Sequence, residues 1–135
     1  MSAVSEMLWT YAENLEDVDR SMLMDCIDAC VECVQACTAC ADSCLGERDV
    51  ADLTRCIRAN LDCADICDST ARVLTRHSGY DTTLLRSVLE GCAVACRTCA
   101  AECELHADDH RHCEFCARAC RLGEEACNAL LGTLA

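Results

Sequence analysis

The sequence contains no proline, no lysine, only five glycines and only four aromatic residues. So few aromatics exclude an ordinary aromatic-rich core. The missing proline and scarce glycine argue against a loop-rich disulfide mini-protein and favour long helices. Charged residues interrupt every stretch of about 18 residues, so we expect no segment to span a membrane.

Positively charged residues are also scarce. The 135 residues hold 24 Asp and Glu against 11 basic residues, all of them arginine, which gives a net charge of −13. Such a surface repels phosphate backbones and anionic lipid. We therefore expect neither nucleic acid nor membrane among the partners.

The N-terminal stretch lacks the features of an export signal. Residues 1–14 have no basic segment, no twin arginine and no long apolar run. We expect the protein to stay in the cytoplasm, where thiols persist as thiols. The 17 cysteines, an odd number, then serve something other than disulfides.

Four long helical segments can be predicted from their boundary residues, with Gly46 and Gly79 near two ends and Asp81 near one start. They cover residues 17–45, 50 to about 77, 81 to about 107, and 110 almost to the C-terminus, after a short amphipathic helix over residues 2–14. Short connections make neighbours antiparallel. We predict an all-α fold in a single domain over residues 1–135: an up-down-up-down four-helix bundle with a short N-terminal helix.

Every cysteine falls on one stripe of its helix, at alternating steps of 4 and 3 residues. The first helix carries Cys26, Cys30, Cys33, Cys37, Cys40 and Cys44. The second carries Cys56, Cys63 and Cys67, the third Cys92, Cys96, Cys99 and Cys103, and the fourth Cys113, Cys116, Cys120 and Cys127. Asn60 and Gly123 fill gaps, and His106 and His110 continue the third stripe. Four such stripes facing one axis predict a core tube lined by thiols.

The bundle is predicted to have two unlike ends. A hydrophobic plug closes one end with Met22, Leu74, Leu85, Leu89, Leu130 and Leu134. The other end, a polar mouth, gathers Cys44, Cys56, His106, His110 and Cys113. We interpret Met7, Met22 and Met24 as core fillers, not thioether ligands, and His77 and His112 as solvated.

Several chemistries could use such a tube. Cysteine as a plain small hydrophobe would be prone to oxidation and would bury less apolar area than leucine. Zinc in closed four-thiolate sites, each of charge −2, would accumulate negative charge in a dry core. A redox or iron–sulfur protein remains an alternative, although the ferredoxin cysteine run is missing. Cu(I) fits better, since it is soft and accepts two or three bridging thiolates.

At about one ion per thiolate the core stays near neutral, which allows roughly 17 Cu(I) per chain. Each ion displaces a thiol proton. No nucleophile–base pair, metalloprotease motif or phosphate loop can be found, so we expect no enzymatic activity. A zinc or general thiol metal sink stays open as the alternative.

The pattern resembles one known family, the cysteine-rich copper storage proteins of bacteria, in their cytosolic branch. The resemblance is carried by the run from Cys26 to Cys44, the stripe from Cys92 to His110 and the CxxCxxxC start of the fourth helix. It implies a tetramer of four-helix bundles, many Cu(I) ions and a mouth bearing histidines. By position His106 and His110 match those histidines, and Asn60 lies where another mouth ligand could stand.

The resulting hypothesis is a cytosolic Cu(I) store that buffers copper and limits its toxicity. Copper ions, other copies of the chain and a copper chaperone that delivers the metal are the expected partners. All 17 cysteines together with His106 and His110 are the expected metal ligands.

Overall fold

The computed structural model describes residues 2–11 and 18–134. Within them every regular element is helical: α1 (Ala3–Leu8), α2 (Arg20–Leu45), the 3-10 turn η1 (Val50–Leu53), α3 (Thr54–Thr75), α4 (Thr82–Glu104) and α5 (Arg111–Leu131). The expected helix start at Asp17 and the expected extension of the N-terminal helix through residues 12–14 lie outside the described residues. No helix of the described part is long and apolar enough to cross a membrane.

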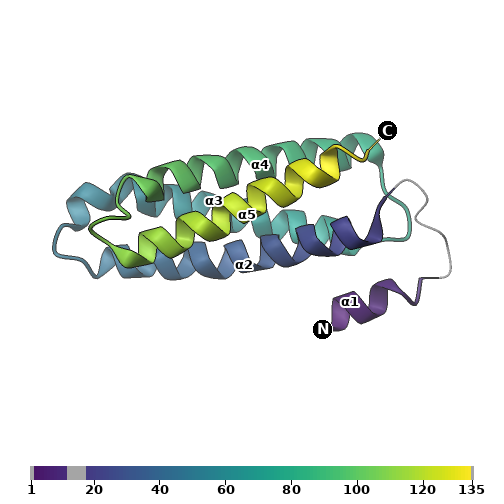
Figure 1. The fold of residues 1–135 in the computed structure, drawn as a ribbon, viewed down its shortest axis with the longest axis horizontal. Helices are drawn as coiled ribbons and strands as arrows, with labels where there is room; N and C mark the ends of the chain where they lie inside the picture. Colours follow the sequence, from purple (N-terminus) through teal and green to yellow (C-terminus); the bar gives the residue numbers. More distant parts are fainter. Residues whose placement is uncertain (1, 12–17, 135) are drawn as a thin grey trace.

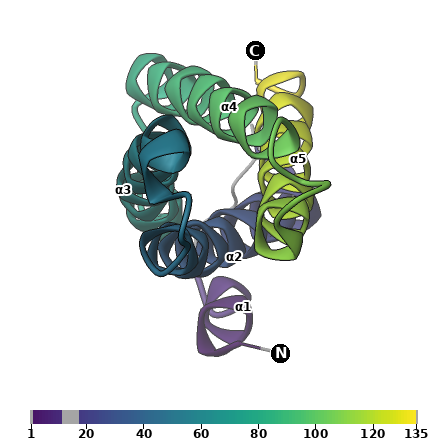
Figure 2. The same ribbon diagram turned by 90° about the vertical axis from the view of Figure 1, so that its left-hand side faces the viewer.

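Helices α2 to α5 form a closed ring, confirming the predicted bundle. Helix α2 packs against α3, α3 against α4 and α4 against α5, and α5 packs back onto α2 (Figure 2). Both connections α2–α3 and α4–α5 lie at the left end in Figure 1, and the α3–α4 connection lies at the other, so the helices run antiparallel. Helix α1 lies outside the ring, on the side of α2, in both views.

Aspartates begin two of the long helices. The side chain of Asp19 accepts a hydrogen bond from the Met22 amide at 2.9 Å, and Asp81 accepts one from the Leu84 amide at 3.0 Å. Each cap satisfies an amide that has no partner inside its helix, typically worth about 1 kcal/mol.

The connection between α4 and α5 begins earlier than predicted. Helix α4 ends at Glu104, not near Ala107, and His110 is the N-cap of α5. His106 and His110 therefore lie in the connection and do not continue the helical stripe of α4. Acidic residues 108–109 and the turn that precedes them release the backbone from the helix.

The hydrophobic plug is confirmed with one change of residue. Leu23, Leu74, Leu85, Leu89 and Leu130 are buried there. The prediction for Met22 was wrong, because its side chain is 37% exposed. The alternating steps of the stripe place Leu23, three residues before Cys26, on the inward face, whereas Met22 would require a second consecutive step of 4. Met7 is likewise exposed, whereas Met24 is buried as expected.

His77 is buried next to the plug, so its prediction as a solvated residue was wrong. The Tyr80 hydroxyl donates to the Leu74 carbonyl, and the Nδ1 atom of His77 lies 2.6 Å from that hydroxyl oxygen. The ring of Tyr11 packs edge-on at 4.8 Å. Burial lowers the pKa of His77, and the nearby positive charge of Arg20 lowers it further, so the neutral ring is favoured here.

Candidate metal site

All 17 cysteines are buried and none is in a disulfide. Their sulfur atoms approach one another at 3.5–4.0 Å, far beyond the roughly 2.05 Å of a disulfide bond. The inward orientation predicted for every cysteine is therefore confirmed. The ring of helices encloses a column of thiols.

Contacts between helices link the thiols into one network. The Sγ atoms of Cys37 and Cys120 lie 3.5 Å apart across α2 and α5, and those of Cys67 and Cys96 lie 3.6 Å apart across α3 and α4. Two Cu–S bonds of about 2.2 Å span such separations when the S–Cu–S angle is bent, and a straight arrangement needs the sulfurs to move to about 4.4 Å apart. Among the groups whose ligand atoms lie close enough to share an ion are Cys37/Cys63/Cys99/Cys120, Cys40/Cys44/Cys56/Cys113, Cys26/Cys30/Cys127, Cys30/Cys67/Cys92 and Cys33/Cys67/Cys96.

Asn60 supplies a polar centre within this column. It is fully buried, and its Oδ1 atom accepts hydrogen bonds from the thiols of Cys99 at 3.1 Å and Cys116 at 3.3 Å. It lies one helical turn inward of Cys56, with its Nδ2 atom 3.8 Å from the sulfur of that mouth cysteine, and its role as a ligand stays a prediction. Its amide orients thiols that would otherwise find only sulfur as acceptor.

Gly123 allows the closest approach between α5 and the thiols. A Cβ atom built there would lie 2.8 Å from the Sγ atom of Cys33 and 3.0 Å from that of Cys96. Both distances are shorter than a real carbon–sulfur contact. The glycine thus leaves room for two sulfur atoms, at the usual helix cost of about 1 kcal/mol relative to alanine.

Replacing Gly123 by alanine will destabilise the metal-free protein by about 1–3 kcal/mol, because the methyl group must displace two packed sulfurs. Thermal or urea unfolding followed by circular dichroism measures the effect. The matched control is Gly91→Ala in α4, where an added Cβ meets nothing within 4 Å. That control should gain up to about 1 kcal/mol from helix propensity. Equal gains for both variants would contradict the packing argument.

The mouth brings four thiols and an unexpected histidine together. Beyond the cluster of cysteines there, the Nδ1 atom of His112 lies 3.5 Å from Cys40 Sγ, 3.6 Å from Cys113 Sγ and 4.0 Å from Cys44 Sγ. The prediction of His112 as solvated was wrong. It sits in the first turn of α5, next to Cys113, where a side chain can turn over the end of the bundle.

The two predicted mouth histidines lie farther out, against carboxylates. His110 Nε2 is 3.1 Å from Asp49 Oδ2, and His106 Nε2 is 3.6 Å from Glu102 Oε1. The hydrogen bond between His110 and Asp49 raises the pKa of His110 and lowers that of Asp49. The rim therefore carries nitrogen and oxygen donors, while the interior carries sulfur.

Burial sets the protonation of the outer thiols. It raises the pKa of Cys44 to about 11 and also raises the pKa of Cys113. Near pH 7 the metal-free thiols of Cys44 and Cys113 are therefore neutral. A metal ion has to displace their protons.

A sealed four-helix ring filled with mutually contacting thiols defines a protein that holds soft metal ions. The copper storage protein family matches residues 19–132 of this chain, most of its length. The chain belongs to this family.

Its relatives include proteins with bound copper. The copper storage protein Ccsp from Streptomyces lividans, loaded with 10 copper equivalents, is 53% identical, with a TM-score of 0.96 over 98% of this chain and 100% of that one. The Cu(I)-bound copper storage protein BsCsp3 is 35% identical, with a TM-score of 0.72 over 81% and 97% of the two chains. The cysteine-rich protein YhjQ of Bacillus subtilis is 36% identical over 105 residues, 78% of this chain and 92% of that one.

Proposed function

We propose that this protein stores Cu(I) in the cytosol, where it buffers copper and keeps it from damaging chemistry. The observation that carries the proposal is the column of buried thiols, with sulfur–sulfur contacts of 3.5–4.0 Å, that extends from the leucine plug to the mouth. A related protein from Streptomyces lividans is itself described as a cytosolic copper storage protein. The family's role is storage, and we propose no catalytic step.

The proposed ligands are the 17 thiolates, with His106 and His110 as the residues that copper meets at the rim. Bridging thiolates shared between two ions keep the charge of the core near zero, which a sealed interior requires. The four-thiol group at the mouth lies directly inside the rim, so it can pass ions inward. A copper chaperone would deliver its ion at this rim.

Zinc and iron–sulfur clusters fit this column less well. Both need sets of four ligands around each metal or cluster, whereas several of the sulfur groups here hold three cysteines and share members, such as Cys30 and Cys67. Shared sulfurs suit a metal that accepts bridging thiolates at low coordination number.

Titration of the reduced, metal-free protein with Cu(I) against a strong chelator tests this function. We expect the chain to bind well above ten ions, approaching about 17, because each thiolate can serve two ions. Competition with Zn(II) on the same sample should leave the copper bound. A plateau at one to four ions per chain would contradict storage.

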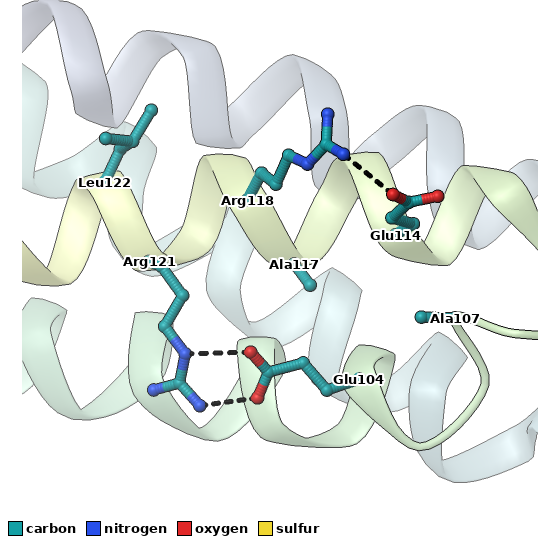
Figure 3. A pocket seen from close by; sticks show the side chains of 7 residues that line it. All are labelled: Glu104, Ala107, Glu114, Ala117, Arg118, Arg121 and Leu122. Atoms are coloured by element: carbon teal, nitrogen blue, oxygen red, sulfur yellow. Dashed lines mark hydrogen bonds and ion pairs between the residues drawn. The ribbon is translucent and has the colours of Figure 1, made fainter.

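We also propose that the chain assembles with copies of itself through the outer face of α5. The groove in Figure 3 runs between α4 and α5, where Arg121 binds Glu104 at 2.6 and 3.1 Å. Leu122 on its border is 60% exposed, and Phe115 is 51% exposed beneath the guanidinium groups of Arg111 and Arg118.

Charge favours a second copy at this face. Helix α5 carries three arginines and three glutamates, so its net charge is zero, and the whole excess of −13 lies elsewhere on the chain. Two copies meeting along α5 avoid the repulsion that other faces would produce. The family resemblance indicates a tetramer as the final assembly.

The variant Leu122→Glu, which adds charge to this face, should lower the oligomeric state seen by light scattering coupled to size-exclusion chromatography. Leu61→Glu on α3, at a side chain 49% exposed on another helix, is the control and should leave assembly unchanged. A parent protein that is monomeric at 100 μM (~100 times a micromolar Kd) would refute the assembly.

A further inference from the structure

Two histidines and one glutamate lie close together at the mouth, outside the thiol column. The Oε1 atom of Glu47 lies 3.5 Å from His110 Nδ1 and 3.4 Å from His112 Nε2. Glu47 comes from the connection after α2, and the two histidines come from the start of α5. Two segments distant in the sequence thus present two nitrogens and one oxygen to each other.

These distances match the edges of a tetrahedral metal site. Zn(II) binds histidine nitrogen and carboxylate oxygen at about 2.0–2.1 Å, so two ligand atoms of a regular tetrahedron lie about 3.3–3.4 Å apart. Each imidazole nitrogen therefore lies at such a distance from the carboxylate oxygen, and the centroids of the two rings are 5.4 Å apart.

The free nitrogen of His112 faces this point. In the described part of the chain, His112 Nε2 is buried and makes no hydrogen bond. Its other nitrogen, Nδ1, lies against the sulfur atoms of Cys40 and Cys113, to which an N–H can donate. With the proton on Nδ1, Nε2 carries a lone pair 3.4 Å from the Oε1 atom of Glu47, and a metal ion would satisfy it.

Asp49 orients the second histidine for the same purpose. Its Oδ2 atom accepts a hydrogen bond from His110 Nε2 at 3.1 Å, which leaves the Nδ1 lone pair of His110 free on the side of Glu47. A carboxylate behind a ligating histidine is the usual second layer of a zinc site and increases ligand basicity. Glu47 and Asp49 also offset the partial positive charge of the α5 N-terminus.

We propose that Glu47, His110 and His112 form a second site for one divalent cation of the Zn(II) class, which shares His110 with the proposed copper entry and has a fourth position open to water. Its donors are nitrogen and oxygen, in contrast to the sulfur donors of the copper column. A cation bound there occupies His110 and covers the four-thiol group of the mouth. It acts as a removable cover that slows the passage of Cu(I) in both directions, a role that goes beyond storage.

Zinc sulfate added to the copper-loaded, reduced protein tests the site, because Cu(I) then occupies the thiolates. Zinc per chain is measured by equilibrium dialysis and elemental analysis, and the ligands are identified by X-ray absorption at the zinc edge. We expect one ion per chain with nitrogen and oxygen neighbours near 2.0–2.1 Å and no sulfur near 2.3 Å. Bound zinc should also slow the removal of copper by a Cu(I) chelator at least about threefold.

Glu47→Gln and His110→Ala should each weaken this zinc binding at least about tenfold. Glu90→Gln is the matched control, since this exposed carboxylate lies on α4 outside the proposed site and the thiol column. The measured quantity is the difference in bound zinc between parent and variant. This comparison does not depend on how much copper the core contains. Sulfur neighbours around zinc, equal binding by parent and Glu47→Gln, or an unchanged rate of copper removal would overturn the proposal.

Discussion

Loading the metal-free protein with Cu(I) will raise the midpoint of its thermal unfolding by more than about 20 °C. Each ion that binds the native state at 1,000 times its Kd adds about 4 kcal/mol, and 1 kcal/mol shifts the midpoint of a domain this size by about 2–8 °C. Several ions in one column exceed that shift even if the unfolded thiols retain part of their affinity. Differential scanning calorimetry under anaerobic conditions measures it.

The metal-free protein provides the reference for this experiment. The leucine plug and the capped helices do not depend on metal, so circular dichroism should show a mostly helical chain before loading. Removing copper with excess Cu(I) chelator should return the midpoint to its starting value. An unfolded metal-free chain, or a midpoint unmoved by ten equivalents of copper, would show that the thiols are not organised in advance.

Acid will weaken copper binding about tenfold for each pH unit below neutrality, or about 100-fold between pH 7.5 and 5.5. Burial raises the pKa of Cys44 to about 11, so near neutral pH the metal-free thiol is protonated and Cu(I) must displace that proton. At about one ion per thiolate, one proton leaves for each copper. Lower pH favours the protonated thiol, so apparent affinity falls as pH falls.

Competition against a chelator calibrated at each pH measures this dependence. Proton release in weakly buffered solution, followed with an indicator dye, is the independent check and should give about one proton per copper. A pH-independent affinity, or far fewer protons than copper ions, would mean that the thiols ionise before metal arrives.

Much of the fold follows from one repeated spacing. Cysteines at steps of 4 and 3 specify both a helix and the face that it buries, and the same pattern in four segments specifies a ring around a common axis. Asp19 and Asp81 begin helices where capping chemistry places them. The thiol-lined core and the leucine plug could therefore be predicted without knowledge of any contact between side chains.

The details at the mouth were not predictable in the same way. At the plug, Leu23 was predictable, because a step of 3 back from Cys26 keeps the alternation, whereas Met22 repeats a step of 4. His112 is out of register, yet at the first turn of a helix its side chain can turn over the mouth. Glu47 belongs to no sequence motif or spacing, because its position depends on where two connections between helices meet.

The leucine plug has a kinetic consequence. With one end of the bundle closed by Leu23, Leu74, Leu89 and Leu130, ions taken up early lie deepest and ions taken up late lie nearest the rim. Copper release then proceeds in the reverse order of copper uptake. If the protein is loaded with one copper isotope and then with another, the second isotope should be released into solution first. The order of release thus reports the order in which the ions were bound.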